Sequence, residues 1–368
     1  MKFVIQRDLI VGLISKIQGV VPSKAVIPIL SNILIEATEK QVVVTATDLT
    51  VSIRAFAPAH VEVEGAVTLP AKKFFQLIRE LTVPEVSIET KDSGIAIITS
   101  GTSHFRLHGM DKDEFPSFPD LSEGKSFTIE APVFKEMLSN TSFAAARDDS
   151  RQVLNGVFME IEKGKAIMVG TDGKRLAKIE KPVEFNENEK QTSIIPLKAV
   201  EEMIKLLDAD QKATITIMSD KIALESSDLC LISKLLSGQF PDYERVIPDK
   251  DSLQEITLHR EELMTLLKQV SLFTSDISHS VRLSFDKGEL TLQATNSDIG
   301  EGNVNMPVDY NNERLDIAFN PQFFIDILRH CKDETINFGI STSFDPGSIS
   351  DTSDSHFVMM PMRLPTTD

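Results

Sequence analysis

Apolar residues recur every three or four positions near the start of the chain, which predicts an amphipathic helix there. The stripe that would face a core consists of Leu9, Ile10, Leu13, Ile14, Ile17 and Val20. A short strand precedes this helix, and the helix has a capping-type start. The same design of a strand followed by a helix returns at FTIEAPVFKEMLSNTSF from Phe127 and at ITLHREELMTLLKQVSLF from Ile256.

Two further patterns repeat in the same order along the chain. One is a β-rich run that enters a turn at Thr47, Thr171 and Thr295, which are spaced 124 residues apart (VVVTATDLTVSIRA, AIMVGTDGKRLAKI, LTLQATNSDIGEGNV). The other is a strand that leads into a second helix (VTLPAKKFFQLIREL, SIIPLKAVEEMIKLL, IAFNPQFFIDILRHC). Three independent markers with one order and nearly one period indicate a threefold internal repeat.

Each repeat is expected to form one lobe, and the three lobes are predicted at residues 1–122, 126–248 and 252–368. Pro, Asp, Ser and Gly cluster at the joints near residues 120–126 and 247–254. Alternating apolar and polar residues predict half-buried antiparallel strands in Val42–Val51, Val86–Ile88, Ile95–Thr99 and Thr214–Glu225. Many strands and only two helices in each lobe predict an α+β fold rather than a parallel βαβ sheet.

The overall charge changes this picture, because 38 Lys and Arg stand against 55 Asp and Glu, a net charge of −17. Such acidity repels phosphate at long range and argues against a generic basic DNA-binding protein. The charge is unevenly spread: residues 1–124 carry 12 − 15 = −3, residues 125–250 carry 18 − 21 = −3, and residues 251–368 carry 8 − 19 = −11. Any anion-binding surface must therefore be built from local patches.

Composition also bears on location and redox state. No apolar run approaches the roughly 20 residues that a membrane helix needs, and Arg7 and Asp8 stand where a signal peptide would need its apolar core. Two cysteines, Cys230 and Cys331, cannot build a disulfide framework or a Cys-rich zinc site. We therefore expect a cytoplasmic protein that does not associate with a membrane.

A local cationic patch is predicted on the second helix of each repeat. Lys72 and Arg79 are seven residues apart, which is two helical turns, so they share a stripe opposite Phe74, Ile78 and Leu81. The matching residues are Lys198 and Lys205 opposite Val200, Ile204 and Leu207, and Gln322 and Arg329 opposite Phe324, Leu328 and Cys331.

Five of these six matched positions are cationic and none is acidic. Exposed helix faces often carry lysine, so a single pair would mean little, but the recurrence favours a surface that faces phosphate. Contacts of this kind position a duplex without reading its sequence. A few weak contacts give a modest, salt-sensitive affinity that suits sliding better than site recognition.

Signatures of catalysis are absent from the sequence. It contains no G-x-G-x-x-G, G-x-S-x-G or H-E-x-x-H motif. The segment GTDGKRL resembles a phosphate loop but has Arg175 where Ser or Thr would bind magnesium, and the seven histidines lack metal-ligand spacing. Asp48 and Asp172 are expected to form turns in separate lobes rather than a carboxylate pair. We expect no enzymatic activity, no metal and no cofactor.

The C-terminal segment HFVMMPMRLPTTD leaves two interpretations open. Met359, Met360 and Met362 surround Pro361, and methionine is the adaptable side chain favoured at surfaces that accept several partners. The same pattern also fits an ordinary core strand followed by a tail.

The motifs together resemble one known family, the bacterial DNA sliding clamp, which is the beta subunit of the replicative DNA polymerase III holoenzyme. The resemblance rests on VMMPMRL, GTDGKRLA, KLLSGQFPDYERVIP, IPILSNILIEA, TATDLTVSIRA and LPAKKFFQLIREL, and it covers essentially the whole chain. It implies a processivity factor whose two chains, each of three similar lobes, join head to tail in a ring around double-stranded DNA.

The family resemblance also implies roles for particular residues. Those that would face DNA are Lys24, Lys72, Arg79, Lys198, Lys205 and Arg329. Those that would join the two chains of a homodimer are Phe105 and Leu107 of the first lobe with Leu272 and Phe273 of the third. Gln322 is uncharged, so the third lobe is expected to contribute less to DNA contact.

The resemblance further implies a hydrophobic cleft that binds short peptide motifs of the polymerase, the clamp loader and repair proteins. Its expected residues are Leu154, Thr171, Gly173, Lys174, Arg175, Leu176, Pro241, Arg245, Val246, Val358, Met360, Pro361, Met362, Arg363 and Leu364. The tail Pro365–Asp368 extends beyond the usual end of the family and could partly cover this cleft. During replication the protein would associate with the nucleoid.

Two other functions stay open from the residues alone. The runner-up is a repeat scaffold that binds only proteins and whose cationic stripes are solvated faces. A nucleotide hydrolase that uses GTDGKR ranks last, because its loop lacks the magnesium-binding residue.

Overall fold

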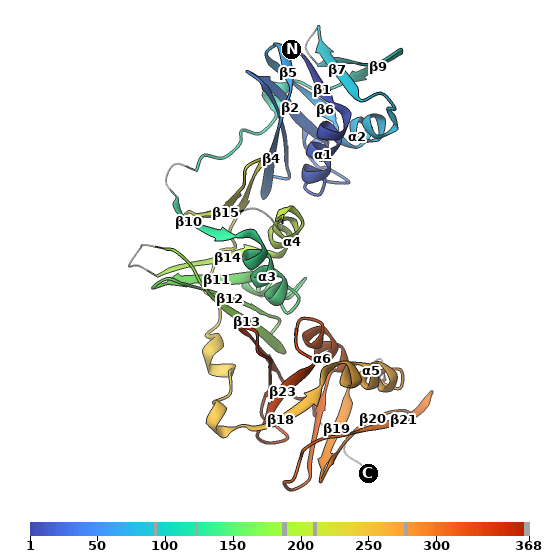
Figure 1. Cartoon of the computed structure of the whole chain (residues 1–368), viewed down its shortest axis with the longest axis vertical. Helices are drawn as coiled ribbons and strands as arrows, with labels where there is room; N and C mark the ends of the chain where they lie inside the picture. The colour runs from blue at the N-terminus through green and yellow to red at the C-terminus, as the bar shows by residue number, and fades with distance from the viewer. Residues whose placement is uncertain (92–93, 122–123, 186–189, 209–211, 276–278, 364–368) are drawn as a thin grey trace. The chain divides into compact units, whose positions relative to one another are not determined.

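The threefold repeat of the sequence is a threefold repeat of structure in a computed structural model of the chain (Figure 1). The residues described are 1–91, 94–121, 124–185, 190–208, 212–275 and 279–363. Within them, each repeat has the order strand, helix, several strands, helix and three strands. The helices are α1 (Arg7–Ile17), α2 (Ala71–Glu80), α3 (Ala131–Ser142), α4 (Leu197–Leu206), α5 (Arg260–Ser271) and α6 (Pro321–Leu328).

The strands follow the same three groups. The first repeat contains β1 (Lys2–Gln6), β2 (Asn32–Thr38), β3 (Gln41–Thr47), β4 (Val51–Pro58), β5 (His60–Val63), β6 (Gly65–Pro70), β7 (Glu85–Thr90), β8 (Ile95–Ser100) and β9 (Ser103–His108). The second contains β10 (Lys125–Glu130), β11 (Gly156–Glu162), β12 (Lys165–Thr171), β13 (Arg175–Pro182), β14 (Gln191–Pro196), β15 (Lys212–Ile217), β16 (Lys221–Glu225) and β17 (Leu229–Lys234). The third contains β18 (Gln254–His259), β19 (Val281–Asp286), β20 (Glu289–Asn296), β21 (Gly300–Pro307), β22 (Leu315–Phe319), β23 (Thr335–Ile340), β24 (Gly347–Ser350) and β25 (Ser355–Met359).

The chain divides into two compact units, and the middle repeat contributes to both. One unit is Met1–Lys135, Val183–Phe185 and Lys198–Leu236, and the other is Glu136–Pro182, Asn186–Leu197 and Ser237–Asp368. The first holds the sheets β5-β1-β7-β8-β9 and β10-β15-β16-β17-β4-β3-β2-β6. The second holds the sheets β14-β11-β12-β13-β25-β24-β23-β18 and β21-β20-β19-β22. All of these pairings are antiparallel, which confirms the predicted α+β class.

Each eight-stranded sheet is continuous across a boundary between repeats. In the first unit, β17 of the middle repeat pairs with β4 of the first repeat, with Leu231 opposite Ile53. In the second unit, β25 of the third repeat pairs with β13 of the middle repeat, with Phe357 opposite Ala177. All four of these side chains are fully buried. Main-chain hydrogen bonds and apolar packing therefore join neighbouring repeats.

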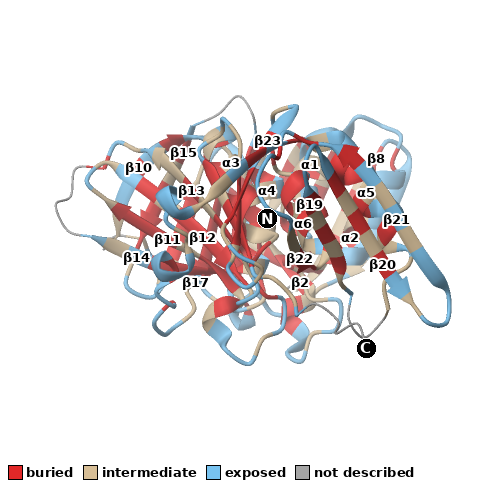
Figure 2. Cartoon of the chain, turned by 90° about the horizontal axis from the view of Figure 1, so that it is seen from below, coloured by how far each residue is buried: buried red, intermediate tan, exposed pale blue. Residues whose placement is uncertain are grey.

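The edges of the two smaller sheets differ from these joined strands. Among the described residues, β9 ends the first unit's five-stranded sheet and β21 ends the second unit's four-stranded sheet, each with a partner on one side only. Both strands are largely exposed, and β21 appears mostly pale blue in Figure 2. An exposed edge of this length is a template for pairing with another strand.

The first helix has the predicted buried stripe, except at its start. Ile10, Leu13, Ile14 and Ile17 are buried, and Val20 is buried just beyond the helix end. Leu9 is 40% exposed, so its assignment to the core was wrong. It lies in the first turn of α1, where it lines an open groove with residues of β1, β4 and β5.

The expected capping-type start of this helix was also wrong. Gln6 occupies the N-cap position without a side-chain hydrogen bond, because β1 runs directly into α1. The Arg7 N–H instead donates to the main-chain oxygen of Pro84 (2.6 Å). A neighbouring main-chain carbonyl thus satisfies a group that a cap would otherwise bind.

Two of the segments predicted to form antiparallel strands are hairpins. Val42–Val51 contains all of β3 except its first residue, then a turn and the first residue of β4. Thr214–Glu225 contains the end of β15 and the whole of β16. The other two segments, Val86–Ile88 and Ile95–Thr99, lie within β7 and β8 as predicted. Alternation persists through a tight antiparallel turn, so the pattern alone does not show where the chain reverses. No helix of the described residues is both long and apolar enough to span a membrane.

Candidate functional site

The cations of α2 lie on its exposed side, as predicted. Lys72 and Arg79 are exposed, whereas Phe74, Ile78 and Leu81 are buried. The Arg79 guanidinium carbon lies 5.4 Å from the centroid of the Phe75 ring. Lys24 is exposed in the loop between α1 and the short 3-10 helix Pro28–Ser31. None of the described residues forms an ion pair with Lys24, Lys72 or Arg79.

The equivalent cations of α4 are exposed but already paired within the chain. Lys198 forms an ion pair with Asp48, at the end of β3, and Lys205 forms one with the buried Glu202 (Nζ to Oε1, 2.7 Å). Burial acts to raise the pKa of Asp48, but hydrogen bonds from Lys198, Val51 and Thr50 outweigh it and hold that pKa below its usual value. The carboxylate is therefore charged at neutral pH.

The opposite face of α4 packs largely as predicted. Val200 and Leu207 are buried, but Ile204 is only half-buried. The buried face is centred instead on Ala199, Val200 and Met203. Ile204 therefore lies at the border of the apolar stripe, one step of 100° from Met203.

The third cationic position belongs to the second compact unit. Arg329 ends α6 and its side chain is 56% exposed, while Phe324, Leu328 and Cys331 are buried as predicted. Its Nη1 lies 3.4 Å from Asp326 Oδ1. Gln322 Nε2 donates to the same oxygen (2.8 Å).

The turn between β12 and β13 forms one wall of the predicted cleft. Thr171 Oγ1 accepts the Gly173 N–H (3.1 Å) and donates to the Arg175 carbonyl (2.6 Å). Asp172 Oδ1 accepts the main-chain N–H groups of Lys174 and Arg175. Gly173 has a φ of +82°, in the left-handed region that glycine adopts without strain. The predicted turn-forming role of Asp172 is confirmed, and GTDGKRL joins two strands rather than the strand and helix that a phosphate loop requires.

The same turn recurs in the first repeat with a different residue at its strained position. Asp48 accepts the N–H groups of Thr50 and Val51, which confirms its predicted turn-forming role. Leu49, at the position of Gly173, has a φ of +74°. The first and middle repeats therefore share this turn geometry although the residues in the turn differ.

Eight of the predicted cleft residues line a single shallow pocket. They are Thr171, Gly173, Lys174, Arg175, Leu176, Val246, Val358 and Met360. Pairing of β13 with β25 places Leu176 opposite Val358, and the Met360 N–H donates to the Lys174 carbonyl (2.9 Å). Val246, from the 3-10 helix Tyr243–Val246, is 42% exposed, as is Met360. The surface of the pocket is mainly apolar, and Thr171, Lys174 and Arg175 add polar groups to its lining.

The remaining predicted cleft residues that the structure describes lie in the same compact unit but outside this pocket lining. Leu154 is buried, Pro241 is exposed, and the exposed Arg245 pairs with Asp242 (2.7 Å). The Met362 N–H donates to Ala318 on β22 (2.7 Å). Pro361 and Met362 are half-buried and Arg363 is exposed, while Leu364 and the tail Pro365–Asp368 lie outside the described residues. Met359 is fully buried, so the C-terminal segment serves both as a core strand and as a pocket wall.

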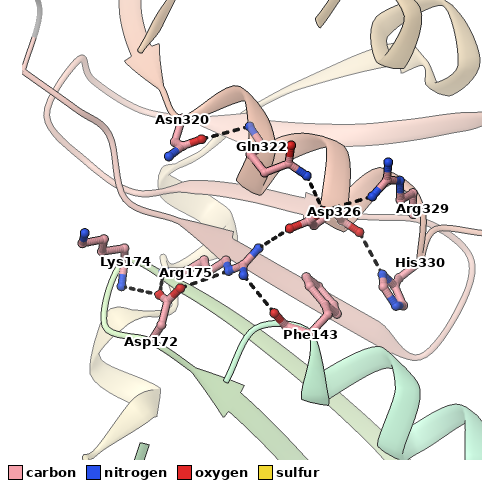
Figure 3. Close-up of polar contacts among 9 residues, drawn as sticks. All are labelled: Phe143, Asp172, Lys174, Arg175, Asn320, Gln322, Asp326, Arg329 and His330. Carbon is pink, nitrogen blue, oxygen red and sulfur yellow. Dashed lines mark hydrogen bonds and ion pairs between the residues drawn. The ribbon is translucent and has the colours of Figure 1, made fainter. Parts of the chain in front are cut away.

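Arg175 is held on several sides (Figure 3). Its guanidinium donates to Asp172 (3.1 Å), to Asp326 (2.8 Å) and to the Phe143 carbonyl (2.9 Å). The guanidinium carbon lies 4.5 Å from the centroid of the Phe323 ring. Its side chain is only 12% exposed. Sequence reasoning did not identify Asp326 or the two phenylalanines as part of this site, because they come from other elements.

A second pocket lies beside the first and shares Lys174 and Arg175 with it. Its other residues include Phe143, Asp149, Asp172 and Phe323. Hydrogen bonds from Arg151 lower the pKa of Asp149 to about 2, so this carboxylate stays charged. A Cβ on Gly173 would lie 3.1 Å from an Arg151 nitrogen, so Arg151 lies next to the cleft turn. Sequence reasoning missed Arg151, for which only its place in an Asp- and Arg-rich loop gave a signal.

The predicted dimer residues lie at the two exposed edges. Phe105 on β9 is 37% exposed and Leu107 is half-buried. Leu272, which follows α5, is 72% exposed, and Phe273 packs partly against the core. A Cβ on Gly302 of β21 would come within 2.6 Å of the Phe273 ring, so this ring covers the edge strand.

Among the described residues, no group of three or more His, Cys, Asp or Glu side chains could hold a metal ion. Burial raises the pKa of Cys230 and of Cys331 to about 12, so both thiols are protonated and weakly nucleophilic. The arrangement offers exposed cations, an apolar pocket and exposed strand edges, all of which serve binding.

Comparison with known proteins accounts for nearly the whole chain. Models of the N-terminal, central and C-terminal domains of the DNA polymerase III beta subunit match residues 1–119, 128–242 and 244–363. A beta sliding clamp from Chlamydia pneumoniae is 50% identical over 364 residues, 99% of each chain.

Solved structures agree with these matches. The DNA polymerase III subunit beta from Pseudomonas aeruginosa has a TM-score of 0.95 and 28% identity, covering 99% of this chain and 100% of that chain. A sliding clamp from Bartonella birtlesii bound to griselimycin has a TM-score of 0.94 and 29% identity, with the same coverage. The resemblance predicted from the sequence motifs is confirmed.

Proposed function

Because the chain belongs to the family of the DNA polymerase III beta subunit, the beta sliding clamp, we propose that it encircles duplex DNA and tethers other proteins to it. The role of a DNA polymerase processivity factor follows from this family, whose members act on DNA in the cell interior. The chain itself would catalyse no reaction and need no cofactor. The observation that best supports DNA encirclement is the set of exposed cations on the second helix of each repeat in an otherwise acidic chain.

In this proposal the lobes are residues 1–122, 126–248 and 252–368, and two chains join head to tail to complete a ring. A head-to-tail contact that closes after two chains produces a ring rather than a filament. The two exposed edges, β9 of the first repeat and β21 of the third, are the natural candidates for this contact. They occupy the same places in their repeats as the strands that join neighbouring repeats within the chain.

The internal joints supply a register for the contact between chains. Pro58, Pro182 and Pro307 end equivalent strands, each opposite the first residue of the preceding strand. At the joint of β17 with β4, the first residue of β17, Leu229, lies opposite Ala55, three residues before Pro58. At the joint of β25 with β13, the first residue of β25, Ser355, lies opposite Ile179, three residues before Pro182. By the same rule, Ser103 of one chain would lie opposite Val304 of its partner.

This register has two consequences for side chains. Phe105 would lie opposite Gly302, where the Phe273 ring occupies the space that a side chain would otherwise fill, so Phe105 would lie near that ring. It would then occupy the place of the fully buried Leu231 and Phe357 at the internal joints. Arg106 would lie opposite Glu301, and opposite charges at such cross-strand positions are favourable. The register therefore agrees with the predicted contact of the Phe105 strand with the region of Phe273.

DNA contact is proposed through Lys24, Lys72, Arg79, Lys198, Lys205 and Arg329. Lys198, Lys205 and Arg329 already have carboxylate partners, so a phosphate must compete with Asp48, Glu202 and Asp326 for them. This competition weakens each contact and keeps the affinity modest. Retention on DNA would then depend on the closed ring rather than on tight contacts.

The pocket at the β12–β13 turn is proposed to bind short peptide motifs of the replicative polymerase, the clamp loader and repair proteins. Its exposed Val246 and Met360 suit apolar side chains of an extended peptide. Two solved relatives, from Pseudomonas aeruginosa and Bartonella birtlesii, bind griselimycin. The full set we propose adds Leu154, Pro241, Arg245, Pro361, Met362, Arg363 and Leu364 to the residues that line the pocket.

Retention on circular DNA tests encirclement directly. Protein loaded on a nicked plasmid circle is expected to stay bound in high salt, because leaving a circle requires the ring to open. Cutting the circle once with a restriction enzyme is expected to release it, which gel filtration of the DNA-bound fraction measures. Protein that stays on the linear DNA would rule out topological linkage.

Removing the acidic competitor of Lys198 is expected to strengthen contact with DNA. Asp48→Asn keeps the side-chain oxygen that accepts the turn hydrogen bonds but loses the charge paired with Lys198. We expect about two- to fivefold tighter binding of a short duplex at low salt, corresponding to one exposed ion pair. Fluorescence anisotropy measures this affinity. Glu64→Gln changes the net charge equally and should have little effect; equal gains in both variants would contradict a role for Lys198.

A charge placed in the pocket is expected to weaken peptide binding. Val246→Asp should weaken binding of a fluorescein-labelled C-terminal tail peptide of the polymerase by about tenfold or more, because docking would desolvate a carboxylate. Val26→Asp is the control, since Val26 is 98% exposed and lies in the other compact unit. Unchanged peptide affinity in Val246→Asp would place the peptide elsewhere.

A charge swap tests the register between chains. Arg106→Glu and Glu301→Arg should each weaken the dimer by about tenfold, because each creates a like-charge pair at an opposed position. The double variant restores opposite charges and should recover most of the loss. Sedimentation velocity distinguishes the 40.8 kDa chain from its dimer. A double variant no better than the single variants would exclude this register.

A further inference from the structure

The carboxylate of Asp326 binds groups from both candidate sites of the second compact unit (Figure 3). Its Oδ2 accepts from Nη1 of Arg175, which lines the pocket (2.8 Å). Its Oδ1 accepts from Gln322 (2.8 Å) and from Arg329 (3.4 Å), the two matched stripe positions of α6. One side chain therefore joins the pocket wall to the helix face proposed to contact phosphate.

On the pocket side, Asp326 helps to hold the Arg175 side chain in place. Arg175 also donates to Asp172, which itself accepts the N–H groups that shape the turn from Thr171 to Leu176. The guanidinium packs against Phe323 and is almost fully enclosed. Loss of the bond to Asp326 would free one end of Arg175 and loosen the turn that lines the pocket.

On the helix side, the contact of Asp326 with Arg329 is the weakest of the three. The distance is long at 3.4 Å and the Arg329 side chain is 56% exposed, so a phosphate can capture it. Asp326 would then keep Arg175 as its only cationic partner. The interaction with Arg175 would strengthen, and the pocket wall would become better ordered before a peptide arrives.

The backbone around Asp326 is fixed independently of these side chains. His330 donates from Nδ1 to the Asp326 main-chain oxygen (2.8 Å), and its ring stacks on Phe143 at a centroid distance of 4.1 Å. Burial lowers the pKa of His330, so this ring is neutral at physiological pH and adds no competing charge. The carboxylate of Asp326 can therefore exchange partners without moving α6.

The matching residue in the middle repeat lacks this connection. Glu202 occupies the place of Asp326, 124 residues earlier, and also pairs with the cation three residues on, Lys205. The residue that corresponds to Arg175 in the first repeat is Val51, which has no charge to offer. The connection is therefore confined to the joint that carries the pocket.

We propose that Asp326 is a positioning residue that couples peptide binding in the pocket to phosphate contact at Arg329. The inference rests on the proposed function, because it assumes that the pocket binds peptides and that α6 meets DNA. Coupling of this kind is reciprocal, so a bound peptide would also favour phosphate contact at Arg329.

The test measures the affinity of the labelled polymerase tail peptide with and without a saturating 30-base-pair duplex at low salt. For the wild type, the duplex should tighten peptide binding about two- to fivefold, the factor that corresponds to an exposed ion pair. Arg329→Gln should bind the peptide about as tightly without DNA as the wild type does with it. Asp326→Asn should bind the peptide about tenfold more weakly and lose the effect of the duplex.

The control is Glu202→Gln, which removes the matching carboxylate and should leave both peptide affinities unchanged. If Asp326→Asn weakens peptide binding but the duplex still tightens it by the wild-type factor, Asp326 is only structural and the inference fails. Arg329→Gln does not disturb the core, so a wild-type duplex effect in this variant overturns the inference even if Asp326→Asn folds poorly. A wild-type protein that binds no peptide would instead overturn the proposed function of the pocket, and the inference with it.

Discussion

Pairing between edge strands of neighbouring repeats is the interaction on which the rest of the structure depends. Each repeat has two edge strands that can pair with other repeats, and an unpaired strand edge leaves main-chain donors and acceptors without partners. The pairs β4 with β17 and β13 with β25 satisfy these groups inside the chain and bury apolar side chains at the joints. The edges β9 and β21 stay open, and the same geometry gives the proposed contact between two chains its register. The pocket also depends on such a pair, since Leu176 and Val358 lie opposite each other across β13 and β25.

Equivalent positions of the three repeats carry different chemistry on one backbone. The turn that begins at Thr47 or Thr171 has the same hydrogen bonds in two repeats, yet it presents Val51 in one and Arg175 in the other. Asp48 pairs with Lys198 of α4, whereas Asp172 pairs with Arg175, three residues along in the same turn. A repeated fold keeps the backbone requirements constant, so side chains at the joints are free to differ. One joint therefore carries the pocket that Arg175 lines, while the other carries the ion pair of Asp48 with Lys198.

The charged residues are also placed according to their position in the repeat. A chain of net charge −17 places cations at five of the six matched stripe positions. Three of these cations, Lys198, Lys205 and Arg329, are partly neutralised by acids of the same chain. Weak, compensated contacts suit a protein that must move along DNA, because each contact then costs little to break. The net charge of a protein describes its long-range field and says little about a particular surface.

The sequence by itself determined the repeat, the α+β class, the buried faces of the second helices and the turn-forming roles of Asp48 and Asp172. These features depend on local periodicity and on residues close together in the chain, which a single sequence displays. Its family-specific motifs also predicted eight residues that line one pocket. Only the tertiary structure decided that Lys198 pairs with Asp48, that Leu9 is exposed, and that Arg175 meets Asp326 and Phe323. The partners in these pairs lie more than 140 residues apart, and periodicity carries no information about which distant side chains strand pairing brings together.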